Sequence, residues 1–208
     1  MHSEFRSEAT SGFSVNRPAN DSDRADRGAS LLDQTLAAAS QDKQTVTPEG
    51  KTISTLVDGV LFRDAPTHVD ARGSVVEIYD LRWGWHPAPI VSAHCFTIRP
   101  GFVKGWGLHK THEDRYFILQ GSMELVLYDP RPDSPTYGRV SKIPMSELNR
   151  RLVNIPKFVW HAEHNVGATD VVVIDLPTEP YNHANPDKYR LPIDTALIPY
   201  TFGAARGW

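Results

Sequence analysis

Short apolar runs separated by turn signals occupy the chain from about residue 54 onward, and they constrain the fold more than any other feature. Ser122–Tyr128 shows the pattern clearly. Met123, Leu125 and Leu127 alternate with residues that point to the opposite face, as in a strand with one buried side. The chain's 16 prolines and 14 glycines supply turns between such runs. The sequence therefore favours an all-β chain over a helical bundle.

Ten strands and one short helix, Met145–Arg150, are expected in this region. Turn signals such as Arg72-Gly73 and Gln120-Gly121 fall between the strands. Many short strands at this spacing indicate a sandwich or a jelly-roll barrel. The expected strands are Val60–Arg63, Ser74–Asp80, Val91–Ile98, Gly101–Trp106, Arg115–Leu119, Ser122–Tyr128, Gly138–Ile143, Arg151–Ile155, Ala162–Asn165 and Asp170–Leu176.

The first 52 residues have a different composition, rich in Ser, Arg, Asp and Asn and poor in apolar periodicity. Such a segment buries too little surface to offset the entropy of ordering it. A short helix at Leu31–Ala39, capped by Ser30, is expected within it. The prediction is a disordered or loosely packed arm over 1–52, followed by one domain over 53–208.

Charge and cysteine content exclude several classes of protein. A net charge of -3 argues against a nucleic-acid partner, which requires a basic face. Cys95 is the one cysteine, so an internal disulfide and a cysteine-cluster zinc site are excluded, and we expect its side chain to be small and buried. No apolar run approaches the ~20 residues of a membrane span, and no secretory signal is visible. We expect a cytoplasmic protein without a membrane partner.

Two histidine-containing groups carry the chemistry, Gly105–Asp114 and Pro156–Asn165. Because a barrel brings distant strands together in one pocket, His109, Asp114 and His161 are expected to converge. Two imidazoles and one carboxylate suit Fe(II), Mn or Zn. Hydrogen-bonded barrel residues or surface residues are the other interpretation. For His112 and His164 we expect that simpler role.

The spacing of these residues resembles the cupins. Asp114 stands seven residues before Gly121 and five after His109, and Pro156 is followed by His161 and then Asn165. The resemblance implies a cupin double-stranded β-helix, a jelly-roll barrel, with a disordered N-terminal extension. Metal-binding cupins usually carry His-X-His, and Gly107 stands at the earlier histidine position. No metal cofactor is therefore expected, and the alternative is a divalent metal on His109, Asp114 and His161.

Longer strings resemble the dTDP-4-dehydrorhamnose 3,5-epimerase family, in a divergent, epimerase-like branch. Tyr128–Gly138 contains Asp-X-Arg-X-X-Ser-Pro-Thr-Tyr-Gly, Asp70–Glu77 contains Asp-X-Arg-Gly, and Gly-Leu-His ends at His109. The resemblance covers roughly residues 55 to 202. It implies an isomerase that removes a proton next to a sugar C4 ketone and returns it on the other face, with a nucleotide-sugar substrate. It also implies a homodimer.

The resemblance also implies roles for individual residues. His109 is the general base, a task that suits histidine near neutral pH. Asp194 orients it, and Asp175 or Tyr181 supplies the acid. Two family groups are replaced here, because Asp114 stands near the position of the family's enolate-binding Lys and Asp175 near that of its Tyr. The expected substrate-binding residues are Arg72 and Glu77 on the nucleotide, in some cases across the subunit interface, together with Lys104, Arg115 and His161.

Three functions follow from these residues. The first is an epimerase or isomerase acting on a dTDP-4-keto-6-deoxyhexose in deoxysugar or polysaccharide biosynthesis. The second is a metal-dependent cupin. The third is a cupin that binds a sugar without turning it over, since a scaffold can be kept after its chemistry is lost. We place the first ahead of the other two because the family match is long.

Overall fold

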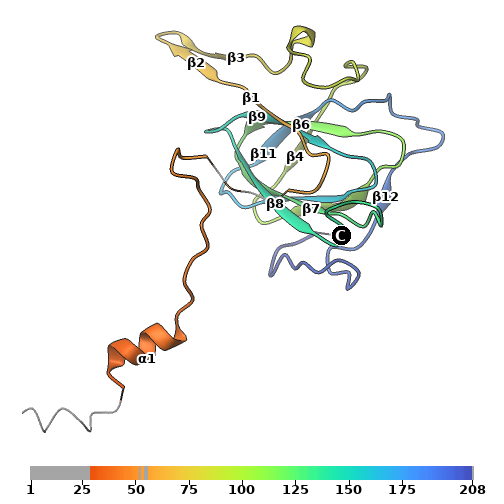
Figure 1. Ribbon diagram of the computed structural model, residues 1–208. Helices are drawn as coiled ribbons and strands as arrows, with labels where there is room; N and C mark the ends of the chain where they lie inside the picture. Colours follow the sequence, from red (N-terminus) through yellow and green to blue (C-terminus); the bar gives the residue numbers. More distant parts are fainter. Residues whose placement is uncertain (1–28, 52, 54–55, 208) are drawn as a thin grey trace, which may run out of the picture. The chain divides into compact units, whose positions relative to one another are not determined.

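The computed structural model describes residues 29–51, 53 and 56–207, and the chain divides into two units, Met1–Ile53 and Ser54–Trp208. In the first unit, α1 spans Leu31–Ala38 (Figure 1). The predicted Ser30 cap is confirmed, because Ser30 Oγ accepts from the Asp33 N–H at 3.2 Å and the Asp33 carboxylate accepts from the Ser30 N–H at 3.1 Å. The disordered or loosely packed arm predicted over 1–52 stays a prediction, and its residues 1–28 and 52 lie outside the described residues.

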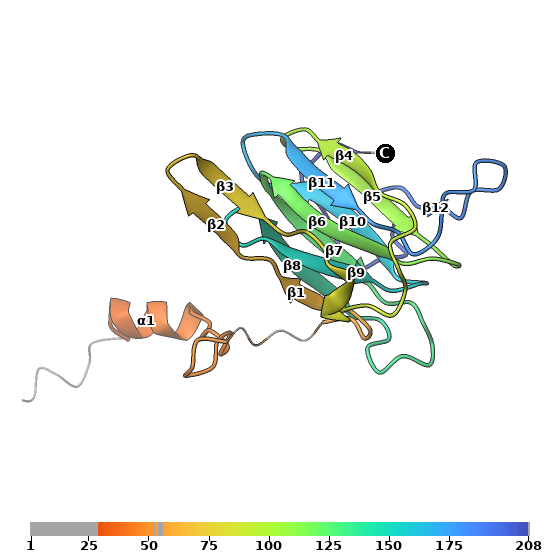
Figure 2. The same ribbon diagram turned by 90° about the horizontal axis from the view of Figure 1, so that it is seen from above.

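Two five-stranded antiparallel sheets form the second unit, with strand orders β1-β9-β6-β11-β4 and β12-β5-β10-β7-β8 (Figures 1 and 2). This arrangement confirms the predicted all-β jelly roll. A separate hairpin, β2-β3, extends from the edge of the barrel. The elements are β1 Phe62–Asp64, β2 Thr67–Asp70, β3 Gly73–Val76, η2 Leu81–Trp83, β4 His94–Ile98, β5 Val103–Leu108, β6 Asp114–Gln120, β7 Ser122–Tyr128, β8 Val140–Ser146, β9 Arg151–Ile155, β10 Trp160–Asn165, β11 Val171–Asp175 and β12 Tyr189–Arg190.

Each of the predicted strands overlaps an observed one, while β2 and β12 were not predicted. The helix predicted at Met145–Arg150 is wrong. Met145 instead pairs with Met123 near the end of β8, and Ser146 is the last residue of that strand. The apolar side chains of Ile143 and Met145 alternate into the core, and this burial outweighs the local preference of a short charged segment.

The core lies between the two sheets, as the alternation in Ser122–Tyr128 predicts. Leu125 and Leu127 are fully buried and pack in one cluster with Ile118. A second cluster surrounds Trp106, which contacts Phe202 and fixes the C-terminal segment against β5. These clusters hold β5, β6 and β10 in place, and those strands position the candidate site.

The expectation for Cys95 is wrong, because its side chain is exposed. It lies on β4, the edge strand of its sheet, where the neighbouring Phe96 packs against the core instead. The alternation along a strand sends Cys95 to the outer face. Among the described residues, no helix is both long and apolar enough to cross a membrane.

Candidate active site

Two neighbouring strands and the start of a third bring the predicted histidine group together. His161 on β10 pairs with Gly107 on β5, His109 follows β5 directly, and Asp114 begins β6. His109 Nε2 lies 3.2 Å and His161 Nε2 3.6 Å from Asp114 Oδ2. The predicted convergence of these three side chains is therefore present, and all three are buried.

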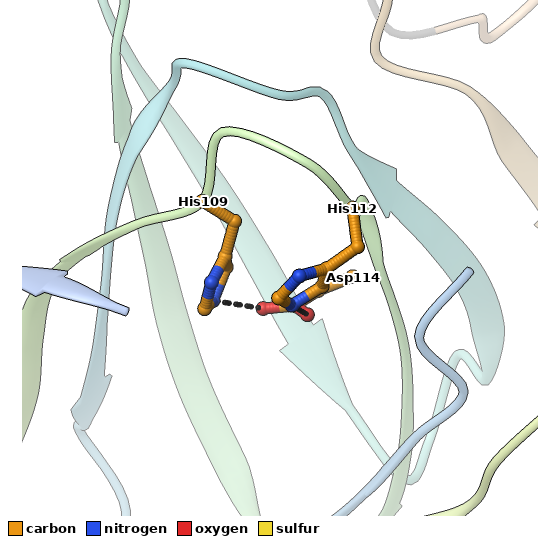
Figure 3. Close-up of side chains that lie close together, drawn as sticks. All are labelled: His109, His112 and Asp114. Atoms are coloured by element: carbon orange, nitrogen blue, oxygen red, sulfur yellow. Dashed lines mark ion pairs between the residues drawn. The ribbon is translucent and has the colours of Figure 1, made fainter. Parts of the chain in front are cut away.

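His112, expected to be a hydrogen-bonded barrel residue or a surface residue, joins this group. Its Nε2 lies 3.4 Å from Asp114 Oδ1, so that His109 and His112 both face the same carboxylate (Figure 3). The imidazole centroids of His109 and His112 are 4.0 Å apart. The His-X-X-His spacing was the available signal, but only the loop between β5 and β6 determines that both rings turn inward.

Asp187, which the sequence analysis did not select, fixes that loop. Its carboxylate accepts hydrogen bonds from the Lys110 N–H at 3.0 Å and the Thr111 N–H at 2.7 Å. It also contacts His112 Nδ1 at 3.0 Å, and its backbone carbonyl contacts His109 Nδ1. Both rings therefore have one nitrogen on Asp187 and the other directed at Asp114.

Burial and charge act against each other in this group. Burial alone would raise the pKa of Asp114, but its interactions with His109 and His112 outweigh burial and hold that pKa well below its usual range. Burial would lower the pKa of His112, but Asp114 and Asp187 raise it. Burial lowers the pKa of His161 to about 3, so this imidazole is neutral at physiological pH.

A cavity of roughly 170 Å³ is lined by His161 but not by His109, His112 or Asp114. Glu163, two residues along β10 and 4% exposed, also lines it, and the sequence analysis did not select this residue. Burial raises the pKa of Glu163 to about 7. The Tyr116 hydroxyl donates to Glu163 at 3.2 Å. The cavity is lined by His94, Phe96, Lys104, Gly105, Gly107, Tyr116, His161, Glu163, Lys188 and Arg190.

Among the predicted substrate contacts, Lys104 and His161 line this cavity and Arg115 does not. The Arg115 side chain is fully buried and donates to the backbone carbonyls of Ala88, Pro89, Leu176 and Pro177. It therefore holds two loops together, and its expected contact with substrate does not fit this placement.

Arg72 and Glu77 do not line the cavity either. Arg72 lies in the turn of the β2-β3 hairpin, paired with Asp70, and Glu77 follows β3 at the surface. Their contact with a nucleotide stays a prediction.

The predicted partners of His109 lie elsewhere. Asp194 lines a separate surface hollow with Phe202 and Arg206, so the carboxylate facing His109 is Asp114 and not Asp194. Tyr181 is 51% exposed and stacks edge-on against His183.

Asp175 is buried on β11, and its carboxylate lies 3.1 Å from Nε2 of His94, which lines the cavity. Burial raises the pKa of Asp175 to about 6.

A second hollow of about 570 Å³ lies next to the cavity, and Arg190 lines both. Its walls combine the aromatic rings of Phe158, Trp160 and Tyr189 with cationic side chains. Lys110 Nζ stands 4.3 Å from the centre of the Tyr189 ring. The hollow is lined by Leu108, Lys110, Pro130, Arg131, Pro132, Phe158, Trp160, Tyr189 and Arg190.

The fold and this site define a class, a cupin jelly roll with a histidine and carboxylate pocket between β5, β6 and β10. The sequence pattern of the family described as dTDP-4-dehydrorhamnose 3,5-epimerase matches residues 54–198. The chain belongs to this family, and the resemblance seen in its motifs is confirmed. Its members are epimerases, and the chain is accordingly a nucleotide-sugar epimerase in type.

Similar proteins agree with this assignment. The chain is 31% identical over 140 residues to "Probable low-salt glycan biosynthesis epimerase Agl13" of Haloferax volcanii, covering 66% of this chain and 89% of that protein. It is 32% identical over 149 residues to "Spore coat polysaccharide biosynthesis protein SpsL" of Bacillus subtilis, covering 71% and 97%. The crystal structure of a dTDP sugar isomerase from Desulfovibrio desulfuricans matches with a TM-score of 0.67 and 25% identity, over 74% of this chain and 98% of that one.

Proposed function

We infer that the protein epimerises a nucleotide-linked 4-keto-6-deoxy sugar during synthesis of a glycan or polysaccharide. The observation that carries this proposal is a buried carboxyl, Glu163, in a cavity that also presents the ammonium groups of Lys104 and Lys188. Removing a proton next to a ketone requires a base with a pKa near the working pH and a positive group for the enolate oxygen. The relatives named for glycan and polysaccharide synthesis support the biological setting.

Glu163 is our candidate for the proton-transfer group. The predicted base His109 has its two ring nitrogens directed at Asp187 and Asp114, and it does not line the cavity. Glu163 lines the cavity, and burial raises its pKa to about 7, so both of its protonation states are populated at physiological pH. Tyr116 donates a hydrogen bond to Glu163 and orients it.

The second hollow is our candidate for the nucleotide. Aromatic faces stack on bases, and arginine and lysine side chains bind phosphate oxygens. Trp160 and Tyr189 provide the rings, and Arg190, which lines both the cavity and the hollow, lies where a diphosphate would join base to sugar. The nucleotide is expected to be dTDP, as in the family's description.

Solvent exchange tests the chemistry. The protein is incubated in deuterated water with dTDP-4-keto-6-deoxyglucose, and proton NMR follows C3 and C5. We expect deuterium at one or both carbons, at a rate reduced at least ~100-fold in Glu163→Gln. If deuterium exchange persists in Glu163→Gln but is lost in His109→Ala, the general base is His109 and not Glu163. Tight binding without exchange in the wild type would support the sugar-binding alternative.

The homodimer and the cytoplasmic location stay proposals, which rest on the family resemblance and on the sequence. A mass of twice 23.3 kDa by light scattering after size exclusion would support the dimer, and a mass of 23.3 kDa would contradict it.

A further inference from the structure

We propose that His109, His112 and Asp114 form a binding site for one divalent first-row transition metal ion. The site lies behind the sugar cavity, in the loop that joins β5 to β6. One donor atom from each of these residues lies within 4.8 Å of the others. The histidine that completes the set is His112, and not His161, which faces the cavity.

Distances within the set fit a metal centre. His109 Nε2 and His112 Nε2 lie 3.2 and 3.4 Å from the Asp114 oxygens. Ligand atoms bound tetrahedrally at about 2.1 Å from a zinc ion are separated by about 3.4 Å. The two nitrogen–oxygen distances match this spacing, and the three donor atoms lie within 4.8 Å of one another, so an ion would draw the two rings together.

The contacts of the two rings with Asp187 leave both Nε2 atoms directed at Asp114, where an ion would bind. His109 Nδ1 faces the Asp187 carbonyl, and His112 Nδ1 lies 3.0 Å from the Asp187 carboxylate. Both oxygens only accept, so each Nδ1 carries the hydrogen. In a neutral imidazole the Nε2 atom then presents a lone pair to Asp114, which has no proton to donate. A proton on Nε2 or a metal ion completes this arrangement, and the partnering of Nδ1 by a second residue is typical of metal-binding histidines.

The close approach of Gly107 to His161 explains why the three proposed ligands do not follow the His-X-His spacing. Gly107, at the earlier histidine position, lies against His161, and a Cβ there would be 2.9 Å from His161 Nε2. No side chain fits at residue 107 without moving that ring. His112 instead reaches the same carboxylate from the far end of the loop, which Asp187 holds in place.

The donor set also indicates the kind of ion. Two imidazole nitrogens and one carboxylate oxygen suit Zn(II), Fe(II), Mn(II) or Co(II), whereas Mg(II) and Ca(II) prefer oxygen ligands. His112 also lines a surface hollow with Thr111 and Tyr181, which gives an ion a path to the site.

Cobalt provides a direct test that does not depend on turnover. Full-length protein is stripped with a chelator and titrated with Co(II), while the visible d–d absorption is recorded. We expect bands that saturate at one equivalent, and Co(II) binding at least ~10-fold weaker in His112→Ala. His68→Ala, which removes an exposed histidine on β2, is the matched control and binds as the wild type.

A second measurement, on the wild-type protein, tests the metal site even if His112→Ala fails to fold. Nitrogen-15 NMR of the histidine rings in the stripped wild-type protein reports on each Nε2. Unprotonated Nε2 atoms at His109 and His112, which lose their free signal when Co(II) is added, support the site. Protonated Nε2 atoms that do not respond to Co(II), or a cobalt spectrum that Asp114→Asn leaves unchanged, overturn it.

Discussion

Replacing Glu163 with glutamine should make the folded protein more stable at high pH. The Glu163 carboxyl is 4% exposed, and burial raises its pKa from 4.5 to about 7. Between these two values the folded protein holds a proton that the unfolded chain has released. Stability therefore falls as the pH rises through this window, and the whole penalty is present above pH 7.

The magnitude follows from the size of the shift. A change of one pKa unit corresponds to 1.36 kcal/mol, so a rise from 4.5 to about 7 costs about 3 kcal/mol at pH 8. Glutamine removes the titrating group and keeps the shape. Glu163→Gln should therefore gain up to about 3 kcal/mol at pH 8 and little at pH 4.

Urea unfolding of both proteins at several pH values between 4 and 8.5 measures this effect. Glu147→Gln, which changes an exposed glutamate in the turn after β8, is the control and should run parallel to the wild type. If the difference between Glu163→Gln and the wild type is the same at every pH, Glu163 does not carry a raised pKa and the reasoning is refuted. Loss of solvent exchange together with a gain in stability would mark Glu163 as a group kept for activity.

Three further predictions concern neighbouring features. Lys188→Met removes a positive charge that lowers the pKa of Glu163, so the pH at which turnover rises should increase. A pH–rate profile identical to that of the wild type would contradict this. Gly107→Ala should displace His161 and slow turnover by ~10–100-fold with an unchanged circular dichroism spectrum, while Gly167→Ala, where a Cβ meets only ordinary contacts, should not. Asp129 is fully buried, and burial alone would raise its pKa, but hydrogen bonds from Arg131, Ser134 and Thr136 outweigh burial and lower it. The ionised carboxylate therefore stabilises the fold above the ordinary aspartate pKa of 3.8, and this stabilisation is lost as the pH falls below that value. Asp129→Ala should cost about 3 kcal/mol in urea unfolding at pH 7, and Asp133→Ala, at an exposed position of the same loop, should cost little.

The loop around Asp129 shows what the Tyr128–Gly138 motif could and could not predict about the site. The string from Tyr128 to Gly138 was informative as a family signature, but its residues do not line the cavity next to His161. Ser134 Oγ and Thr136 Oγ1 donate to Asp129 at 2.5 and 2.6 Å, and the resulting turn also bonds to Asp58. Among its residues, Arg131 and its flanking prolines reach the second hollow. The motif therefore identified the family better than it identified the site.

Strand periodicity predicted a sandwich or a jelly-roll barrel, and the resemblance to the cupin motifs predicted the barrel and the meeting of His109, Asp114 and His161. Both depend on which residues share a strand face, and alternation along the sequence carries that information. The roles of the remaining residues depend on loops and on burial, which have no signature along the chain. Asp187 lies more than 70 residues from the loop that it fixes, and Glu163 has a near-neutral pKa because other elements exclude water from it. The sequence by itself determined the strand pattern and the place of His109 and His161. The tertiary structure decided which nitrogen faces which oxygen and which side chains line the cavity, because loop packing and burial join residues that lie far apart along the chain.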